Sequence, residues 1–186
     1  MQLMLRFQNG DMQAFDALFQ KYAPALVNFA AQFLGNRARA EEIAQDVLLR
    51  VYGQRDRYQP TAKFSTWLFK IAQNHCLNEV RRREYKLRRE PLDPQEGQPE
   101  PNLPSPQAGP EQVLEGEELA ARIRGILLAM PDNQRTAILL SRQEGMSYQE
   151  VATVIGCTQK AVKSLVFRAT QRLRAGLQDI MDEDEA

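Results

Sequence analysis

The sequence lacks the features that mark membrane, secreted and disulfide-rich proteins. No run of 18 apolar residues occurs in its 186 positions, which excludes a transmembrane helix. The first residues contain neither a basic leader nor a cleavage site, so we expect no signal peptide. The two cysteines, Cys76 and Cys157, are too few and too far apart for a disulfide framework or a zinc knuckle. This cysteine usage suits a cytoplasmic protein.

Catalytic patterns are missing as well. The chain has no glycine-rich phosphate loop, no nucleophile elbow and no paired carboxylates at catalytic spacing. His75 and Cys76 are adjacent, but no cluster of acidic or cysteine residues has metal-ligand spacing with them. We therefore expect no catalytic residues, no metal site, no cofactor and no enzymatic activity.

The formal net charge of zero hides a strong segregation of charge. Residues 1–90 carry a surplus of +6 and residues 119–176 another +6, whereas residues 91–118 carry −7 and residues 177–186 carry −5. Two basic blocks separated by an acidic one favour two modules that each face a polyanion.

The acidic block between the basic ones has the composition of a linker. Seven of the ten prolines fall between Pro91 and Pro110, and residues 91–118 contain no aromatic residue. Such a segment buries too little apolar surface to offset its ordering entropy. A long loop inside one domain is the competing interpretation, which the change of composition on both sides disfavours.

Both flanks of this linker have helical periodicity, and neither shows a convincing alternating strand. The sequence thus predicts an all-α protein of two small helical domains joined by a flexible Pro-rich linker. The predicted boundaries are residues 1–90, 91–113 for the linker, 114–178, and 179–186 for an acidic tail. The apolar stripes are Phe15, Leu18, Phe19, Tyr22, Leu26, Phe29 and Phe33; Ile43, Ala44, Val47, Leu48 and Val51; Leu68, Ile71, Ala72, Cys76 and Val80; and Leu119, Ile123, Ile126, Leu127 and Met130.

Residues 147–174 carry the strongest local signal. Ser147 and Glu150 have the spacing of a capping box, which starts a helix that Gly156 can end. Thr158 is a candidate N-cap for a second helix, whose inner stripe begins at Val162. A short helix, a tight turn and a polar, basic second helix predict a helix-turn-helix that enters a DNA major groove.

These motifs resemble the bacterial sigma factors of the extracytoplasmic-function group, in the sigma-70 family. Residues 148–152 (YQEVA) and 162–164 (VKS) match that family's helix-turn-helix. Residues 40–47 (AEEIAQDV) resemble its polymerase-binding segment, and residues 64–74 (FSTWLFKIAQN) resemble the segment that opens and reads the −10 element. The resemblance implies a subunit that binds the RNA polymerase core and directs promoter recognition and transcription initiation, under the control of an anti-sigma factor.

Site residues follow from the outer helical faces and from this resemblance. The −35 contacts are predicted at Thr158, Gln159, Lys160, Lys163, Ser164, Arg168 and Arg172. The −10 contacts are predicted at Lys63, Trp67, Lys70, Asn74, Asn78, Arg81 and Arg82. The alternative for each set is an ordinary solvated helix face. Trp67 is left open between stacking on a DNA base and packing in the core.

A third set would bind the polymerase core: Gln45, Asp46, Leu49 and Arg50. Leu49 is an apolar residue predicted to point outward beside charged ones, as in a partner-binding patch. The second candidate function is a stand-alone helix-turn-helix regulator whose N-terminal helices sense a ligand or dimerise. Such a regulator binds duplex DNA without polymerase, often as a dimer on a palindrome.

Overall fold

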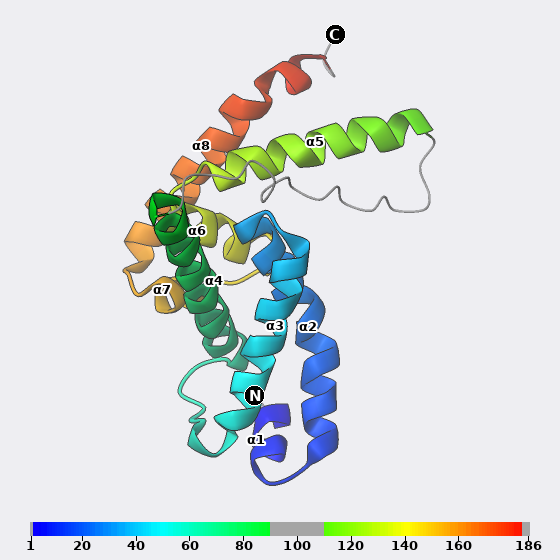
Figure 1. Ribbon diagram of the computed structural model, residues 1–186. Helices are drawn as coiled ribbons and strands as arrows, with labels where there is room; N and C mark the ends of the chain where they lie inside the picture. The colour runs from blue at the N-terminus through cyan, green and yellow to red at the C-terminus, as the bar shows by residue number, and fades with distance from the viewer. Residues whose placement is uncertain (1, 90–109, 184–186) are drawn as a thin grey trace.

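A computed structural model describes residues 2–89 and 110–183, and all the regular secondary structure over these residues is helical (Figure 1). No described residue lies in a strand. The first domain contains α1 (Gln2–Gln8), α2 (Met12–Leu34), α3 (Arg37–Gly53), a short 3-10 helix (Arg55–Arg57) and α4 (Phe64–Arg89). The second contains α5 (Pro110–Leu128), α6 (Asp132–Arg142), α7 (Tyr148–Ile155) and α8 (Gln159–Glu183). The predicted all-α fold with two helical domains is confirmed.

Local signals set the helix boundaries in the first domain. The Asp11 side chain accepts a hydrogen bond from the Ala14 N–H and starts α2, and Asn36 caps α3 in the same way. Between these helices, Gly35 adopts a φ of 70°, which ends α2 in the left-handed conformation that glycine tolerates best. The helix α1 is not predicted by the apolar stripes, because its seven residues are too few to show a clear periodicity.

The predicted stripes form the core of this domain with one correction. The stripe of α3 is buried along its whole length, from Ile43 to Val51. In α2 the Phe19 side chain is 44% exposed, although its position in the stripe predicts burial. Its neighbour Leu18 points into the core. Because a helix turns by about 100° between adjacent residues, Phe19 is rotated away from the core and towards solvent.

The first and last helices of the second domain extend beyond its predicted boundaries, residues 114 and 178. α5 begins at Pro110 and so includes the last four residues of the predicted linker, because proline is well suited to a first helical turn. α8 continues past Gly176 to Glu183, into the predicted tail. At Gly176 a Cβ atom would stand 2.5 Å from Cδ1 of Ile126, so glycine permits α5 and α8 to pack closely. Residues 90–109 and 184–186, which include most of the predicted linker and the end of the predicted tail, lie outside the described residues.

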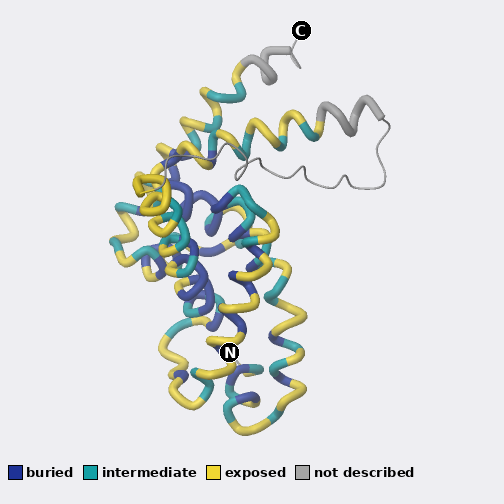
Figure 2. The backbone as a smooth tube through the Cα atoms, in the orientation of Figure 1, coloured by how far each residue is buried: buried dark blue, intermediate teal, exposed yellow. Residues whose placement is uncertain are grey.

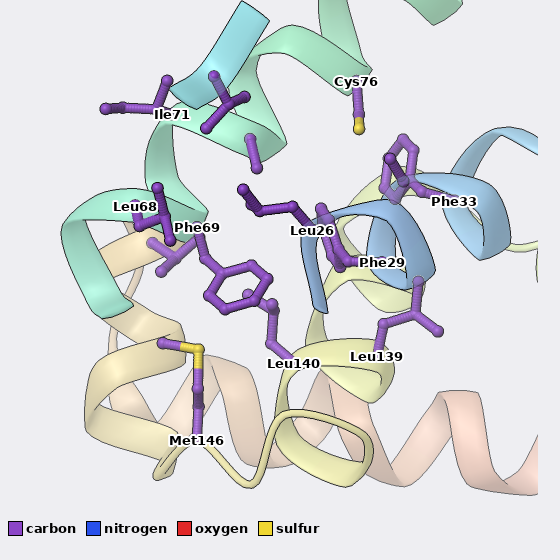
Figure 3. Close-up of a cluster of buried hydrophobic side chains, with 14 of the residues drawn as sticks. Leu26, Phe29, Phe33, Leu68, Phe69, Ile71, Cys76, Leu139, Leu140 and Met146 are labelled. Carbon is purple, nitrogen blue, oxygen red and sulfur yellow. The ribbon is translucent and has the colours of Figure 1, made fainter. Parts of the chain in front are cut away.

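The two domains pack directly on each other, which the sequence pattern does not predict. α6 contacts α2, α7 contacts α4, and buried residues of both domains form one cluster (Figure 2). Figure 3 shows Leu26, Phe29 and Phe69 of the first domain in the same cluster as Leu139, Leu140 and Met146 of the second. Every residue of α6 from Gln134 to Leu140 is buried, so this helix is enclosed on all sides.

Candidate nucleic-acid interface

The turn between α7 and α8 has the geometry that the sequence predicts. The Ser147 N–H donates to Oε2 of Glu150 at 2.8 Å, and the Glu150 N–H donates to Oγ of Ser147 at 3.3 Å, which completes the capping box. Gly156 ends α7 with a φ of 80°. The Ala161 N–H then donates to Oγ1 of Thr158 at 3.2 Å. Thr158 is therefore the N-cap of α8, and its hydroxyl is occupied by the helix start.

The outer face of α8 is continuous, polar and basic. Val162, Val166 and Ala169 are buried against the rest of the domain. All the residues that the sequence assigns to the −35 element are exposed: Thr158, Gln159, Lys160, Lys163, Ser164, Arg168 and Arg172. Lysine and arginine side chains on one helix face can contact phosphates while the polar residues between them reach base edges.

Two residues modify this predicted surface. Phe167 is 63% exposed, four residues after Lys163, and so lies within the basic face. The helical spacing places it on this outward face, where it is bulkier than the family resemblance implies. Arg172 lies at the edge of the face and also lines a groove between the two domains.

A second polar face runs along α4. Phe64, Leu68 and Phe69 are buried. Lys63, just before the helix, is exposed, as are Lys70, Asn74, Asn78, Arg81 and Arg82 along it. Arg83, which completes the arginine triplet, turns inward: its Nη1 donates to the Leu34 carbonyl at 3.4 Å. Two of the three arginines are therefore free to face a ligand, and they are the two that the sequence assigns to DNA.

Trp67 lies in an aromatic cluster. Its ring centroid is 5.1 Å from that of Tyr58 and 5.9 Å from that of Phe64, and the residue is partly buried. Tyr22 extends the cluster on the other side of Phe64, at 5.2 Å. Trp67 therefore packs against other aromatic side chains, as one of its two interpretations predicts, while part of its surface stays accessible.

An ion-pair network fixes α3 against α4. Nη2 of Arg39 lies 2.9 Å from Oε2 of Glu79, and Arg39 also pairs with Glu42 on its own helix. Nε of Arg83 reaches the same Glu79 carboxylate at 3.4 Å. Burial raises the pKa of Glu79, but its bond to Arg39 and the nearby arginines outweigh burial, and the net pKa is lowered. The Glu79 carboxylate therefore stays charged, and its ion pair with Arg39 holds α3 and α4 together.

The patch predicted to bind the polymerase core is on the outer face of α3. Gln45, Asp46, Leu49 and Arg50 are all exposed. Leu49 has 68% of its surface accessible, the largest fraction among the exposed large hydrophobic residues of the described chain. An apolar side chain surrounded by polar ones is typical of a partner-binding surface.

Two family models match the two helical units. Sigma-70 region 2 matches residues 18–85, and Sigma-70, region 4 matches residues 120–173. A relative from Rhodopseudomonas palustris, the ECF RNA polymerase sigma factor EcfG, is 35% identical over 82% of this chain and 78% of its own. The chain belongs to the extracytoplasmic-function (ECF) sigma factors. It is a sigma factor that binds the RNA polymerase core and directs promoter recognition and transcription initiation.

A further relative matches nearly the whole sigma factor, and two solved structures share its fold. The RNA polymerase sigma-H factor of Pseudomonas aeruginosa is 29% identical over 98% of this chain and 95% of its own. The solved structure of CnrH in complex with the cytosolic domain of CnrY covers 95% of this chain and 96% of that one, with a TM-score of 0.71 and 24% identity. The sigma factor RpoE of Bartonella quintana, solved with the anti-sigma factor NepR, covers 88% and 96%, with the same TM-score and identity.

The match also links the two faces to the family's regions. Region 2 includes α3 and most of α4, and region 4 includes α7 and most of α8. Over the described residues of the sigma factor, no helix combines the length and the apolar character needed to cross a membrane.

Proposed function

We propose that this sigma factor holds the −35 element with α8, reads and opens the −10 element with α4, and docks on the polymerase core through α3. The observation that carries the proposal is the pair of exposed basic faces, on α4 and α8, each backed by a buried apolar stripe. The units that carry the two faces are residues 1–90 and 114–178.

On α8, Lys160, Lys163 and Arg168 would contact phosphates on either side of the major groove. Gln159 and Ser164, near the N-terminal end of the helix, are placed to reach base edges. Phe167 adds an apolar contact of the kind that recognises a thymine methyl group. Thr158 contributes mainly as the cap of the helix, because its hydroxyl already accepts a backbone hydrogen bond.

On α4, the amides of Asn74 and Asn78 would read base edges while Lys70, Arg81 and Arg82 contact phosphates. Lys63 contributes charge at the start of the same face. Trp67 would contribute through its accessible edge and support the surface from within the aromatic cluster. The polymerase performs the chemistry of RNA synthesis, and the sigma factor supplies binding energy and strand separation in the cytoplasm.

On α3, Leu49 would insert into an apolar pocket of the core enzyme, with Gln45, Asp46 and Arg50 forming the polar rim. We also propose that an anti-sigma factor controls the chain, as the family resemblance implies. Such a regulator would compete with the core for the α3 patch, so a saturating amount of it should abolish core binding.

Reconstituted transcription tests this function. The purified chain is added to bacterial core polymerase with a promoter library at one stated salt concentration, because affinity for DNA depends steeply on salt. We expect promoter-directed transcripts that require the chain. Failure to form a core complex would refute the proposal, and specific duplex binding without core, on a palindrome, would favour the stand-alone regulator.

A further inference from the structure

The last two turns of α4 carry an exposed tyrosine among arginines. Tyr85 is 57% exposed, and Arg81, Arg82, Arg88 and Arg89 precede or follow it by three or four residues. Residues at these spacings are neighbours on a helix surface, so the ring lies in the middle of four guanidinium groups. All four arginines are exposed. The guanidinium of Arg89 lies 4.7 Å from the centre of the Tyr85 ring, a cation–π contact that fixes its position.

The positive charge of this group of side chains has no partner in the described part of the chain. None of the four arginines forms an ion pair with a described residue. Glu84, the one acidic residue between 81 and 89, lines the groove against the end of α5 and the start of α6. Lys86 adds a further charge four residues after Arg82, and like charges at this spacing repel each other along a helix. A polyanion bound here would relieve that repulsion.

This end of α4 has no packing role that would explain its composition. Residues 84–89 are all exposed, so the last turns of the helix extend beyond the packed core (Figure 2). The match to region 2 ends at residue 85 and therefore does not reach Arg88 or Arg89. An exposed aromatic ring among unpaired arginines is a combination typical of nucleic-acid surfaces, because guanidinium groups bind phosphates and aromatic rings pack on the groups between them.

The tyrosine and its arginines continue the proposed −10 face of α4. Lys70, Asn74, Asn78 and Arg82 follow one another at intervals of four residues. At about 1.5 Å per helical residue, Lys70 to Arg82 extend for about 18 Å, the length of about five base pairs. From Arg82 to Arg89 the helix extends for about 10 Å more, the length of about three further base pairs. The basic face is therefore longer than the proposed −10 contacts require.

The order of the helices indicates which side of the −10 element this extension reaches. In the proposed function α8 holds the −35 element, which lies upstream, and the domain that contains α8 follows α4 in the chain. The C-terminal end of α4 is the end from which the chain continues to that domain, so we expect it to face upstream. The DNA there is double-stranded, with a high density of phosphate charge that arginine binds well.

We propose that Tyr85, Arg88 and Arg89 bind the duplex immediately upstream of the −10 element, continuing the contact made by Arg81 and Arg82. Arg88 and Arg89 bind backbone phosphates, and Tyr85 is a positioning residue that holds the Arg89 guanidinium against its ring. The inference rests on the proposed function, because it takes α4 as the helix that binds the −10 element. It adds a DNA contact between the two elements that carries little sequence information, since every base pair presents the same phosphates.

Binding of the polymerase holoenzyme to two DNA probes tests the site. Both come from a promoter that the chain transcribes: a fork with duplex upstream of the −10 element, and a −10 single strand without that duplex. Arg88→Ala with Arg89→Ala should weaken binding to the fork several-fold and reduce the slope of log affinity against log salt by about 2. Binding to the single strand should not change. The control, Arg37→Ala with Arg142→Ala, removes the same charge from exposed positions outside the proposed surfaces and should change neither.

A double-mutant cycle tests the role of the tyrosine. Tyr85→Phe keeps the aromatic ring and should keep wild-type affinity for the fork, whereas Tyr85→Ala should weaken it. In a chain that already carries Arg89→Ala, Tyr85→Ala should have no further effect, because the ring acts through that arginine. An equal loss in both backgrounds would show that the ring contacts DNA by itself and would overturn the positioning role.

The outcomes separate this inference from the proposed function. A holoenzyme that binds neither probe refutes the proposed function. If the wild-type holoenzyme binds both probes and the Arg88→Ala, Arg89→Ala variant behaves like its control, the upstream site alone is overturned. A loss of equal size on the fork and on the single strand would place these arginines on the −10 strand and would also overturn the upstream site.

Discussion

The carboxylate of Glu150 lies 2.8 Å from the ammonium of Lys63 while it also accepts the Ser147 N–H, so one side chain both starts α7 and joins α7 to the first domain. A substitution of Glu150 therefore affects both the cap of α7 and the contact between the domains. Substituting Lys63 removes the bond to the first domain alone, whereas substituting Ser147 removes its hydroxyl from the helix cap and leaves the bond from its backbone N–H in place.

The first prediction concerns the −35 face. The double substitution Lys163→Ala, Arg168→Ala should lower promoter affinity and reduce the slope of log affinity against log salt by about 2, because two phosphate contacts are lost. Fluorescence anisotropy of the polymerase complex on labelled promoter DNA, at several salt concentrations, measures both. The control is Lys21→Ala, Arg142→Ala, which removes the same charge from exposed positions outside the proposed surfaces. An identical salt slope in the two double variants would contradict the assignment.

The second prediction concerns the patch on α3. Asp46→Ala with Leu49→Ala should weaken core binding about tenfold, because a central apolar anchor is worth at least about 1 kcal/mol. Thermal unfolding should hardly change, since both side chains are exposed. Met12→Ala with Asp16→Ala, on the exposed face of α2, is the matched control. If both pairs bind the core with wild-type affinity, the patch has no part in docking.

The third prediction concerns the start of α7. Ser147→Ala removes the side-chain half of the capping box and should lower the free energy of unfolding by about 1 kcal/mol. Urea unfolding monitored by circular dichroism measures the change. Thr153→Ala removes an exposed hydroxyl of the same helix that bonds only to the Gln149 carbonyl. If both variants lose a similar free energy of unfolding, the cap stabilises α7 no more than an ordinary exposed hydroxyl does.

The fourth prediction concerns pH. The bonds from Lys63 and Ser147 lower the pKa of Glu150 to about 2, from an ordinary value of 4.5. Because the folded-state pKa is depressed, the stabilisation is complete above about pH 4.5 and is lost as the pH falls through 2. Carboxyl NMR should follow this titration directly.

Lys63→Met should raise the Glu150 midpoint, yet leave it below 4.5 because Ser147 still donates. Lys70→Met, an exposed lysine of the same face, serves as the control. A midpoint that does not move in Lys63→Met would mean that the ion pair is not formed in solution.

Much of this fold could be predicted because its signals are local. The capping box at Ser147, the left-handed Gly156 and the apolar stripe of α3 each depend on residues a few positions apart. The outward direction of Leu49 and of the basic residues on α8 follows from the same helical period.

The contact between the domains could not be predicted in this way. Arg135 bonds to Phe33 across 102 positions, and neither residue carries a local pattern that selects the other. The run from Thr136 to Leu140 indicates burial, but a helical period alone does not distinguish one packing partner from two. The outward position of Phe167 follows from the helical period, but the sequence leaves open how an exposed aromatic ring affects −35 recognition.

The enclosure of α6 has a consequence for how the chain can vary. Seven consecutive residues of this helix, Gln134 to Leu140, fit neighbours from both halves of the protein. A substitution in this helix has to pack well against neighbours from both domains, so few substitutions should leave the fold stable. In a mutational scan, we therefore expect α6, which has no proposed DNA contact, to tolerate fewer substitutions than α8, which has several.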